Sequence, residues 1–168
     1  KLEAVLDEEN LFCLSLTEDY RDSLRKGMAW REEMSYKEVI VHSRLNKDEV
    51  AKMHETMSYR EIAEKKNLRT DSVTKITNKE IGERAGINEE TVGRCISGTR
   101  VSQHTLILIC LALHLPYLAS MKILNTAGEG LKMVDKSQQW YHFVLMNMYG
   151  HLVTEVKDFL SARGADPL

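Results

Sequence analysis

The chain has 168 residues, of which 43% are hydrophobic and 29% charged, and this mixture is sufficient for a packed core. The formal net charge of −2 excludes a polybasic or histone-like protein, so any contact with nucleic acid must come from a local patch. Two prolines and nine glycines are too few for a many-stranded β-sandwich or barrel and favour long helices.

The three cysteines, Cys13, Cys95 and Cys110, form no C-x-x-C pair, which argues against both a disulfide framework and a zinc site. No signal peptide opens the sequence, and its longest apolar run, 106–113, is far shorter than the roughly 18 residues of a membrane span. We therefore expect a cytoplasmic protein without membrane contact. Because the first residue is Lys1 and not Met, we also expect a longer parent chain with an upstream domain.

The N-terminal region, residues 1–34, is expected to be helical. Residues 1–12 predict a weak helix. Thr17 is placed to cap a second helix that runs to about Glu33. The apolar side of this second helix consists of Tyr20, Leu24, Met28 and Met34.

An internal repeat follows, with copies at 34–53, 57–76 and 76–95. The first two copies share eight of twenty residues, and the third shares four with the second. Such self-similarity indicates a supersecondary structure that is used more than once.

Each copy has the same order of local signals. A capping box opens it, then come a short helix, a turn, an apolar residue and a second short helix. Two short helices joined by a tight turn are typical of a helix-turn-helix. The three capping boxes are Ser35 with Glu38, Ser58 with Glu61, and Thr77 with Glu80.

The third copy matches the pattern best. Gly82 permits close approach of the second helix, Gly86 suits a left-handed turn, and Asn88 can cap the second helix. Its Val92 and Cys95 are expected in the core. The second copy has the tolerable Ala63 and Asn67 at the positions of Gly82 and Gly86. The first has Ile40 and Arg44, which suit them poorly.

Residues 48–56 admit two interpretations. They either close the first copy or lead a three-helix arrangement with 58–66 and 70–76, and we favour the second. Further along, a turn at 97–100 precedes a very apolar helix that starts at Ser102 or Gln103 and runs through Leu115. A helix over 117–127, a loop at 128–136 and helices over 137–149 and 152–163 follow. The apolar face of the last helix consists of Leu152, Val153, Val156, Phe159 and Leu160.

Residues 77–127 resemble the Cro and phage-repressor (XRE) class of helix-turn-helix regulators. The resemblance rests on TNKEIGERAGINEETVGR, then SGTR, then HTLILICLALHL. Residues 47–76 separately resemble the homeodomain-like helix-turn-helix of recombinases and sigma factors through MSYREIA. Residues 137–168 resemble the tails of bacterial regulators from mobile elements.

The resemblance implies double-stranded DNA as the partner, with the helix that starts at Asn88 in the major groove and Asn88 itself among the DNA contacts. It implies base-edge contacts from Glu89, Glu90, Thr91 and Arg94, and phosphate contacts from Asn78, Lys79, Thr99 and Arg100. We also expect a second, weaker DNA-binding group made of Arg69, Thr70, Ser72 and Lys75.

Each proposed base contact has a structural alternative. Arg94 can bind guanine, or it can be a surface arginine paired with Glu90 one turn earlier. Glu89 and Glu90 can accept from cytosine N4, or simply stabilise a helix N-terminus. The net charge is −4 over residues 1–56, +2 over 57–100 and zero over 101–168, so the positive excess falls on the two better copies.

The aromatic and methionine side chains of 137–149 cover more than half of that helix. They are Trp140, Tyr141, Phe143, Met146, Met148 and Tyr149. They pack either in an intramolecular core or against a second subunit, and a homodimer would suit a two-fold operator. The six histidines have no metal-ligand spacing, and no glycine-rich phosphate loop, nucleophile elbow or carboxylate pair is present. We expect no enzyme activity, cofactor or metal.

The sequence thus predicts an all-α protein of tandem helix-turn-helix units with a C-terminal helical region that serves dimerisation. Its expected parts are 1–34, 35–76, 77–127 and 128–168. The predicted function is that of a dimeric bacterial DNA-binding transcriptional regulator. The alternative is a helix-turn-helix scaffold that docks another protein, as an antitoxin or anti-repressor does.

Overall fold

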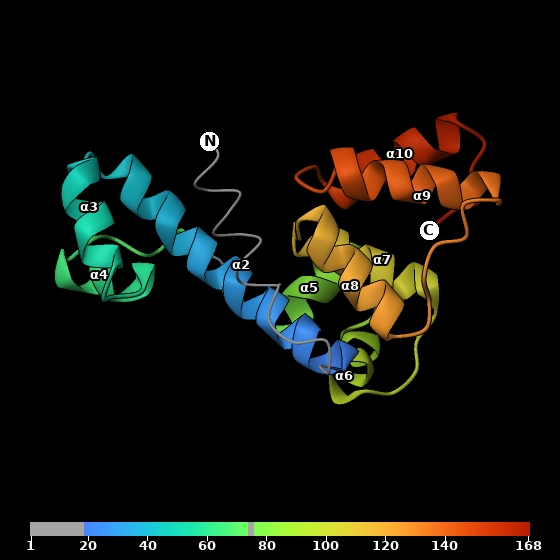
Figure 1. Ribbon diagram of the computed structural model, residues 1–168, viewed down its shortest axis with the longest axis horizontal. Coiled ribbons are helices and arrows are strands. Elements are labelled where there is room, and N and C mark those ends of the chain that lie inside the picture. Colours follow the sequence, from blue (N-terminus) through green and yellow to red (C-terminus); the bar gives the residue numbers. More distant parts are fainter. Residues whose placement is uncertain (1–18, 74–75) are drawn as a thin grey trace. The chain divides into compact units, whose positions relative to one another are not determined.

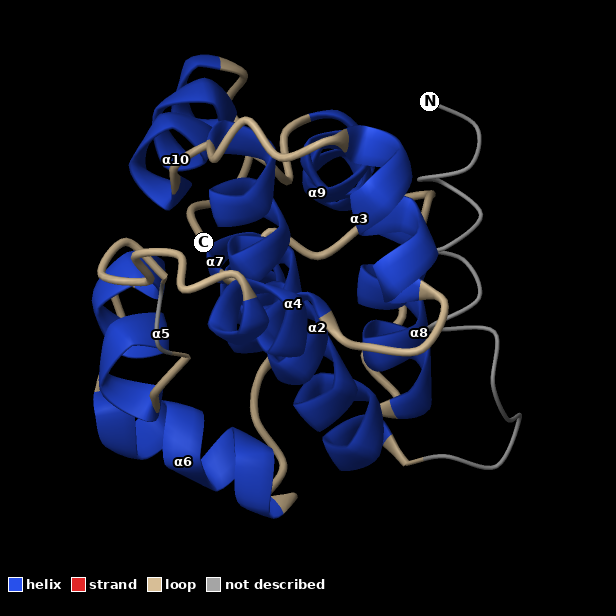
Figure 2. Cartoon of the chain, turned by 90° about the vertical axis from the view of Figure 1, so that its left-hand side faces the viewer, coloured by secondary structure: helices blue, strands red, loops and turns tan. Residues whose placement is uncertain are grey.

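The computed structural model describes residues 19–73 and 76–168, and within these ranges all regular structure is helical (Figures 1 and 2). The expectation of an all-α fold is therefore confirmed. The predicted weak helix at 1–12 and the predicted cap at Thr17 lie outside the described residues. The described residues divide into two compact units. Unit 1 consists of 19–27 and 77–168, and unit 2 consists of 28–73 and 76.

Unit 2 is built from three helices around a small apolar core. They are α2 (Tyr20–His42), whose first turns belong to unit 1, α3 (Lys47–His54) and α4 (Tyr59–Lys65). The core consists of Ile40, Tyr59, Ile62 and Ala63, and Val50 and Leu68 are among the residues packed against it. The Glu33 carboxylate in α2 accepts from the backbone N–H of Tyr59, at the start of α4.

The predicted capping box of the first copy is wrong, because Ser35 lies inside α2 and caps nothing. Its hydroxyl donates to the carbonyl oxygen of Arg31, one turn earlier, at 3.2 Å. A serine that bonds its own helix in this way is compatible with a helix interior. The first helix of this copy is therefore the C-terminal part of a 23-residue helix, while α3, capped by Asn46, is the predicted second helix.

All three copies turn at the equivalent residue. Arg44, Asn67 and Gly86 have φ angles of 61°, 50° and 69°, which are left-handed. The residue after the turn donates back to the helix in two copies, from Leu68 to Ala63 and from Ile87 to Gly82, both at 3.0 Å. The backbone thus confirms the register of the repeat, and it shows that Arg44 adopts a conformation for which the sequence makes it a poor choice.

The second helix of the second copy is not present over residues 70–73, which form turns. The expected three-helix arrangement is therefore wrong for its third helix, which was predicted at 70–76. The end of α2 takes that place as the third helix of unit 2. The segment is short and contains the β-branched residues Thr70, Val73 and Ile76. It is followed at once by the cap at Thr77, so a helix here would have few residues with which to offset the cost of its nucleation.

Unit 1 arranges its remaining helices around a central one, α7. Its helices after α2 are α5 (Asn78–Ala85), α6 (Glu89–Ser97), α7 (Gln103–Ala112), α8 (Tyr117–Thr126), α9 (Lys136–Asn147) and α10 (Val153–Ala162). Every residue of 106–113 is buried, and α5, α8, α9 and α10 all contact α7. Full burial of one leucine or isoleucine stabilises the folded state by about 1.5–3 kcal/mol, so the burial of α7 contributes strongly to the stability of unit 1.

Most predicted helix ends in unit 1 are observed within two or three residues. Ser102 caps α7 through the Thr105 N–H, and Gly128, with a φ of 75°, follows the end of α8. One apolar position differs from expectation: Leu152 is 63% exposed, while Val156 is fully buried. Leu152 precedes α10 at its cap, where its side chain does not share the buried face of the helix.

The two described cysteines behave as core residues. Burial raises the pKa of Cys95 to about 11 and that of Cys110 to about 12, from an ordinary 9.0. Well below pH 9 both thiols are mainly neutral whether the chain is folded or not. Above pH 9 the unfolded thiols ionise while the buried ones do not, so the free energy of unfolding is expected to fall as pH rises toward 11.

In a Cys13→Ser variant, which leaves these two thiols, we expect no fast reaction with a disulfide reagent at pH 8 until denaturant is added. Urea titrations between pH 8 and 10.5 measure the predicted decline in the free energy of unfolding. Rapid labelling of the folded variant would contradict the burial of both thiols.

Candidate nucleic-acid interface

Helices α5 and α6 are joined by a turn of three residues, 86–88. Thr77 caps α5 by accepting from the Glu80 N–H at 3.2 Å, but Glu80 pairs with Arg84 at 2.9 Å, so only half of the predicted capping box is present. A Cβ at Gly82 would lie 2.8 Å from the carbonyl oxygen of Ile87. The close approach that the sequence predicts at Gly82 is therefore confirmed.

Helix α6 presents one face to the core and the other to solvent. Asn88 caps it by accepting from the Glu90 N–H at 2.7 Å, as predicted. Val92 and Cys95 are fully buried, as expected. The leading end is open, because Asn88, Glu89 and Glu90 are all exposed. Unit 1 thus leaves the N-terminal end of α6 uncovered.

The solvent face of α6 borders an open cleft of about 580 Å³. Its lining residues are Asn78, Asn88, Glu89, Glu90, Gly93, Arg94 and Ser97. Five of these are residues predicted to contact DNA, and Gly93 and Ser97 are additional. Asn78, from the first turn of α5, lies against Gly93: a Cβ there would be 3.5 Å from its Nδ2. The cleft therefore joins the start of α5 to the middle of α6.

The charges at this cleft are mixed. The Arg94 guanidinium donates to the Thr91 hydroxyl at 3.3 Å, so its position follows from the previous turn of α6. The Glu89 and Glu90 carboxylates lie in the first turn, where a helix favours negative charge by about 0.3–1 kcal/mol. Lys79, in the first turn of α5, is exposed as well.

The turn after α6 is held by the beginning of α2. Gly98 has a φ of 92°, and the Arg21 side chain packs against it. The Tyr20 hydroxyl donates to the carbonyl oxygen of Thr99 at 2.8 Å. The predicted phosphate ligand Arg100 is 88% exposed and lies 3.5 Å from a carboxylate oxygen of Glu129. Such an exposed ion pair is weak enough to be exchanged for a phosphate.

One basic residue near the interface has no signal in the local sequence. Lys157 of α10 reaches the turn between α5 and α6, where a Cβ at Gly86 would lie 3.4 Å from its Nζ. A cation at this point also suits the C-terminal end of α5. The contact joins residues 71 positions apart and could be found only from the tertiary structure.

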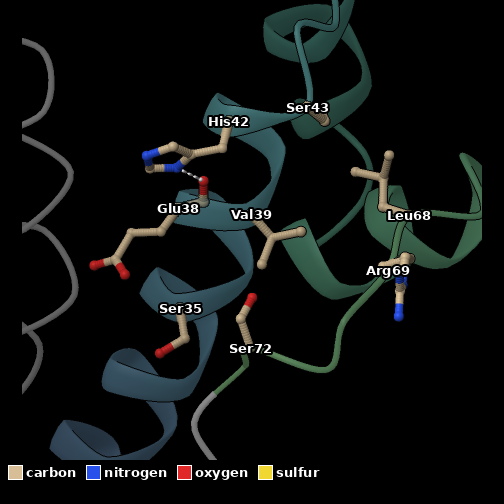
Figure 3. Close-up of a pocket in the computed structure, with 8 residues that line it drawn as sticks. All are labelled: Ser35, Glu38, Val39, His42, Ser43, Leu68, Arg69 and Ser72. Atoms are coloured by element: carbon tan, nitrogen blue, oxygen red, sulfur yellow. Dashed lines mark hydrogen bonds between the residues drawn. The ribbon is translucent and has the colours of Figure 1, made fainter.

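The second predicted group of DNA contacts belongs to unit 2 and is less well formed. Arg69 pairs with Asp71 at 3.1 Å, Ser72 is exposed, Thr70 is half-buried, and Lys75 lies outside the described residues. Figure 3 shows Arg69 and Ser72 at a cavity of about 420 Å³. This cavity lies between α2 and residues 68–72, where no helix presents the group to a duplex.

Comparisons with known proteins identify no relative: no family model, no curated protein and no solved structure matches the chain. In the described ranges no three His, Cys, Asp or Glu side chains are grouped to hold a metal ion. None of the helices in those ranges is long and apolar enough to cross a membrane.

Proposed function

We propose that the protein is a DNA-binding transcriptional regulator that places the N-terminal half of α6 in the major groove. The observation that carries the proposal is the open solvent face of α6, which begins at the exposed Asn88 cap and has a glycine at its centre. A glycine inside a helix costs about 0.5–1 kcal/mol relative to alanine. At Gly93 the nearest atom to an added Cβ is at ordinary contact distance, so no packing within unit 1 requires that glycine.

Close approach of a binding partner to this face of α6 would explain why position 93 is a glycine. A duplex that enters the cleft would pass over Gly93, with Arg94 placed to donate to guanine O6 and N7. Asn78 and Lys79 on one side and Arg100 after the turn would contact phosphates. The Glu89 and Glu90 carboxylates would accept from cytosine N4 and disfavour other bases at those positions.

Two substitutions separate base contacts from phosphate contacts. On a duplex selected from a random library, Arg94→Ala is expected to cost about 1–3 kcal/mol of binding free energy and to relax base preference. Arg100→Ala is expected to weaken all sequences alike and to reduce the salt dependence by about one phosphate contact. Selection followed by fluorescence anisotropy at several salt concentrations measures both effects. If no sequence is enriched and neither variant changes binding at low salt, the proposal fails.

The exposed carboxylates of Glu89 and Glu90 favour a second candidate, in which the same cleft docks a basic or polar segment of another protein. The two functions differ in how they respond to salt. Both kinds of binding weaken with salt because both involve exposed charges, but only DNA releases condensed counterions, so its loss of affinity with salt is steeper and scales with the number of phosphate contacts.

A further inference from the structure

The hairpin of α9 and α10 carries an exposed aromatic stripe on the side that faces away from α7. We define the aromatic stripe as Trp140, Phe143, Met146, Leu152, Phe159 and Arg163. Phe143 is 40% exposed, Met146 44% and Leu152 63%. The opposite side of the hairpin is buried and includes Tyr141, Val144 and Val156. The stripe is therefore not part of the core of unit 1.

Ring contacts join four members of the aromatic stripe, while Met146 follows Phe143 by one turn of α9 and Leu152 stands at the cap of α10. Phe143 of α9 stacks on Phe159 of α10, with ring centroids 5.6 Å apart and planes 10° apart. Trp140 meets both rings edge-on at 5.8 Å. The Arg163 guanidinium lies over Trp140 and Phe159, at 5.3 and 5.0 Å from the ring centroids. These contacts fix the side chains in advance, which lowers the entropy lost when a partner binds.

The size of the aromatic stripe suits a protein partner. A large apolar side chain has about 150–250 Å² to bury, so the exposed fractions of Phe143, Met146 and Leu152 leave on the order of 300 Å² of apolar surface. A stable interface buries about 800 Å² on each partner, of which about two thirds is apolar in homodimers. The stripe supplies more than half of that apolar area.

The charges around the aromatic stripe favour a second copy of the chain. Residues 136–163 contain three basic and two acidic side chains, so the hairpin lacks the single-sign field that an acidic or basic partner would require. A two-fold interface pairs a surface with itself and needs this mixed, nearly neutral character. We propose that the aromatic stripe is a homodimer interface in which the α9–α10 hairpins of two copies pack face to face.

The proposed dimer and the proposed DNA binding are tested separately, because self-association is measured without DNA. Leu152→Asp is the sharpest variant. Leu152 occupies the cap position of α10 without a side-chain cap bond, and aspartate is a preferred cap residue, so the variant is expected to fold. In a symmetric dimer it introduces two charges into the apolar surface.

Sedimentation equilibrium of the full chain is expected to give a dimer at about micromolar concentration. Leu152→Asp should raise the dimer Kd at least about tenfold, with unchanged helical circular dichroism. Phe143→Glu should have the same effect. Val134→Asp, at a 94% exposed apolar residue outside the stripe, should leave the dimer intact.

Three outcomes would overturn the proposal. The first is a wild-type chain that stays monomeric throughout the concentration range. The second is dimers that persist in both stripe variants, which would place the interface elsewhere. The third is a Val134→Asp variant that raises the dimer Kd as much as the stripe variants do, which would show that the effect does not depend on the stripe.

Discussion

Replacing Gly82 with alanine is expected to lower the free energy of unfolding by about 1–3 kcal/mol. The added methyl group would be 2.8 Å from the carbonyl oxygen of Ile87 and 3.3 Å from the backbone nitrogen of Glu89. Both neighbours are backbone atoms in the connection to α6, so the two helices must separate. The expected loss exceeds the gain of about 1 kcal/mol that alanine brings to a helix.

Chemical denaturation of Gly82→Ala beside Gly93→Ala gives an internal comparison. Both changes replace a helical glycine by alanine, but Gly93 has room for the methyl group and should become more stable by about 0.5–1 kcal/mol. Effects of opposite sign are thus expected from one chemical change. Equal stabilisation of both variants would show that α5 and α6 do not approach closely at Gly82.

Replacing Gly93 with leucine is expected to abolish preferential DNA binding while the fold is kept. Leucine is a good helix former and would extend from the solvent face of α6 into the open cleft. If a duplex approaches the helix there, the side chain prevents the Arg94 base contact, worth about 1–3 kcal/mol, and the neighbouring phosphate contacts. A loss of at least tenfold in affinity for a selected duplex follows.

Glu83→Leu is the matched control, because Glu83 is exposed on α5 and does not line the cleft. Anisotropy titrations should find nearly normal affinity for Glu83→Leu, and thermal melts should find both variants folded. Tight binding by Gly93→Leu would mean that this face of α6 does not meet the duplex. The test applies even if α9 and α10 do not mediate dimerisation.

Local signals predicted the caps well, because a cap depends on residues within one turn of the chain. Ser58, Thr77 and Asn88 all accept the backbone N–H bonds expected of them. The same signature misled at Ser35, where no glycine or proline interrupts residues 28–34 and the helix continues. A capping box therefore predicts a helix start only where a helix-ending signal, such as a glycine or proline, precedes it.

Other features depend on contacts that are distant in sequence. The sequence left two arrangements open for the aromatic residues of α9; the structure places Tyr141 in the core of unit 1, while Phe143 and Met146 are exposed. Lys157 reaches Gly86 only because α10 packs against the other helices of unit 1, of which it is a part. The sequence did contain a signal for Gly93, because a glycine inside a predicted helix often has a packing or functional reason.

The shared left-handed residue of the three copies has a wider consequence. Arg44, Asn67 and Gly86 keep one backbone conformation with three different side chains, although an ordinary L-residue pays about 1–2 kcal/mol for it. The turn thus forms in the same backbone conformation without glycine in two of the three copies. A search that demands glycine there would find only the third copy, whereas a comparison of backbone torsions would find all three.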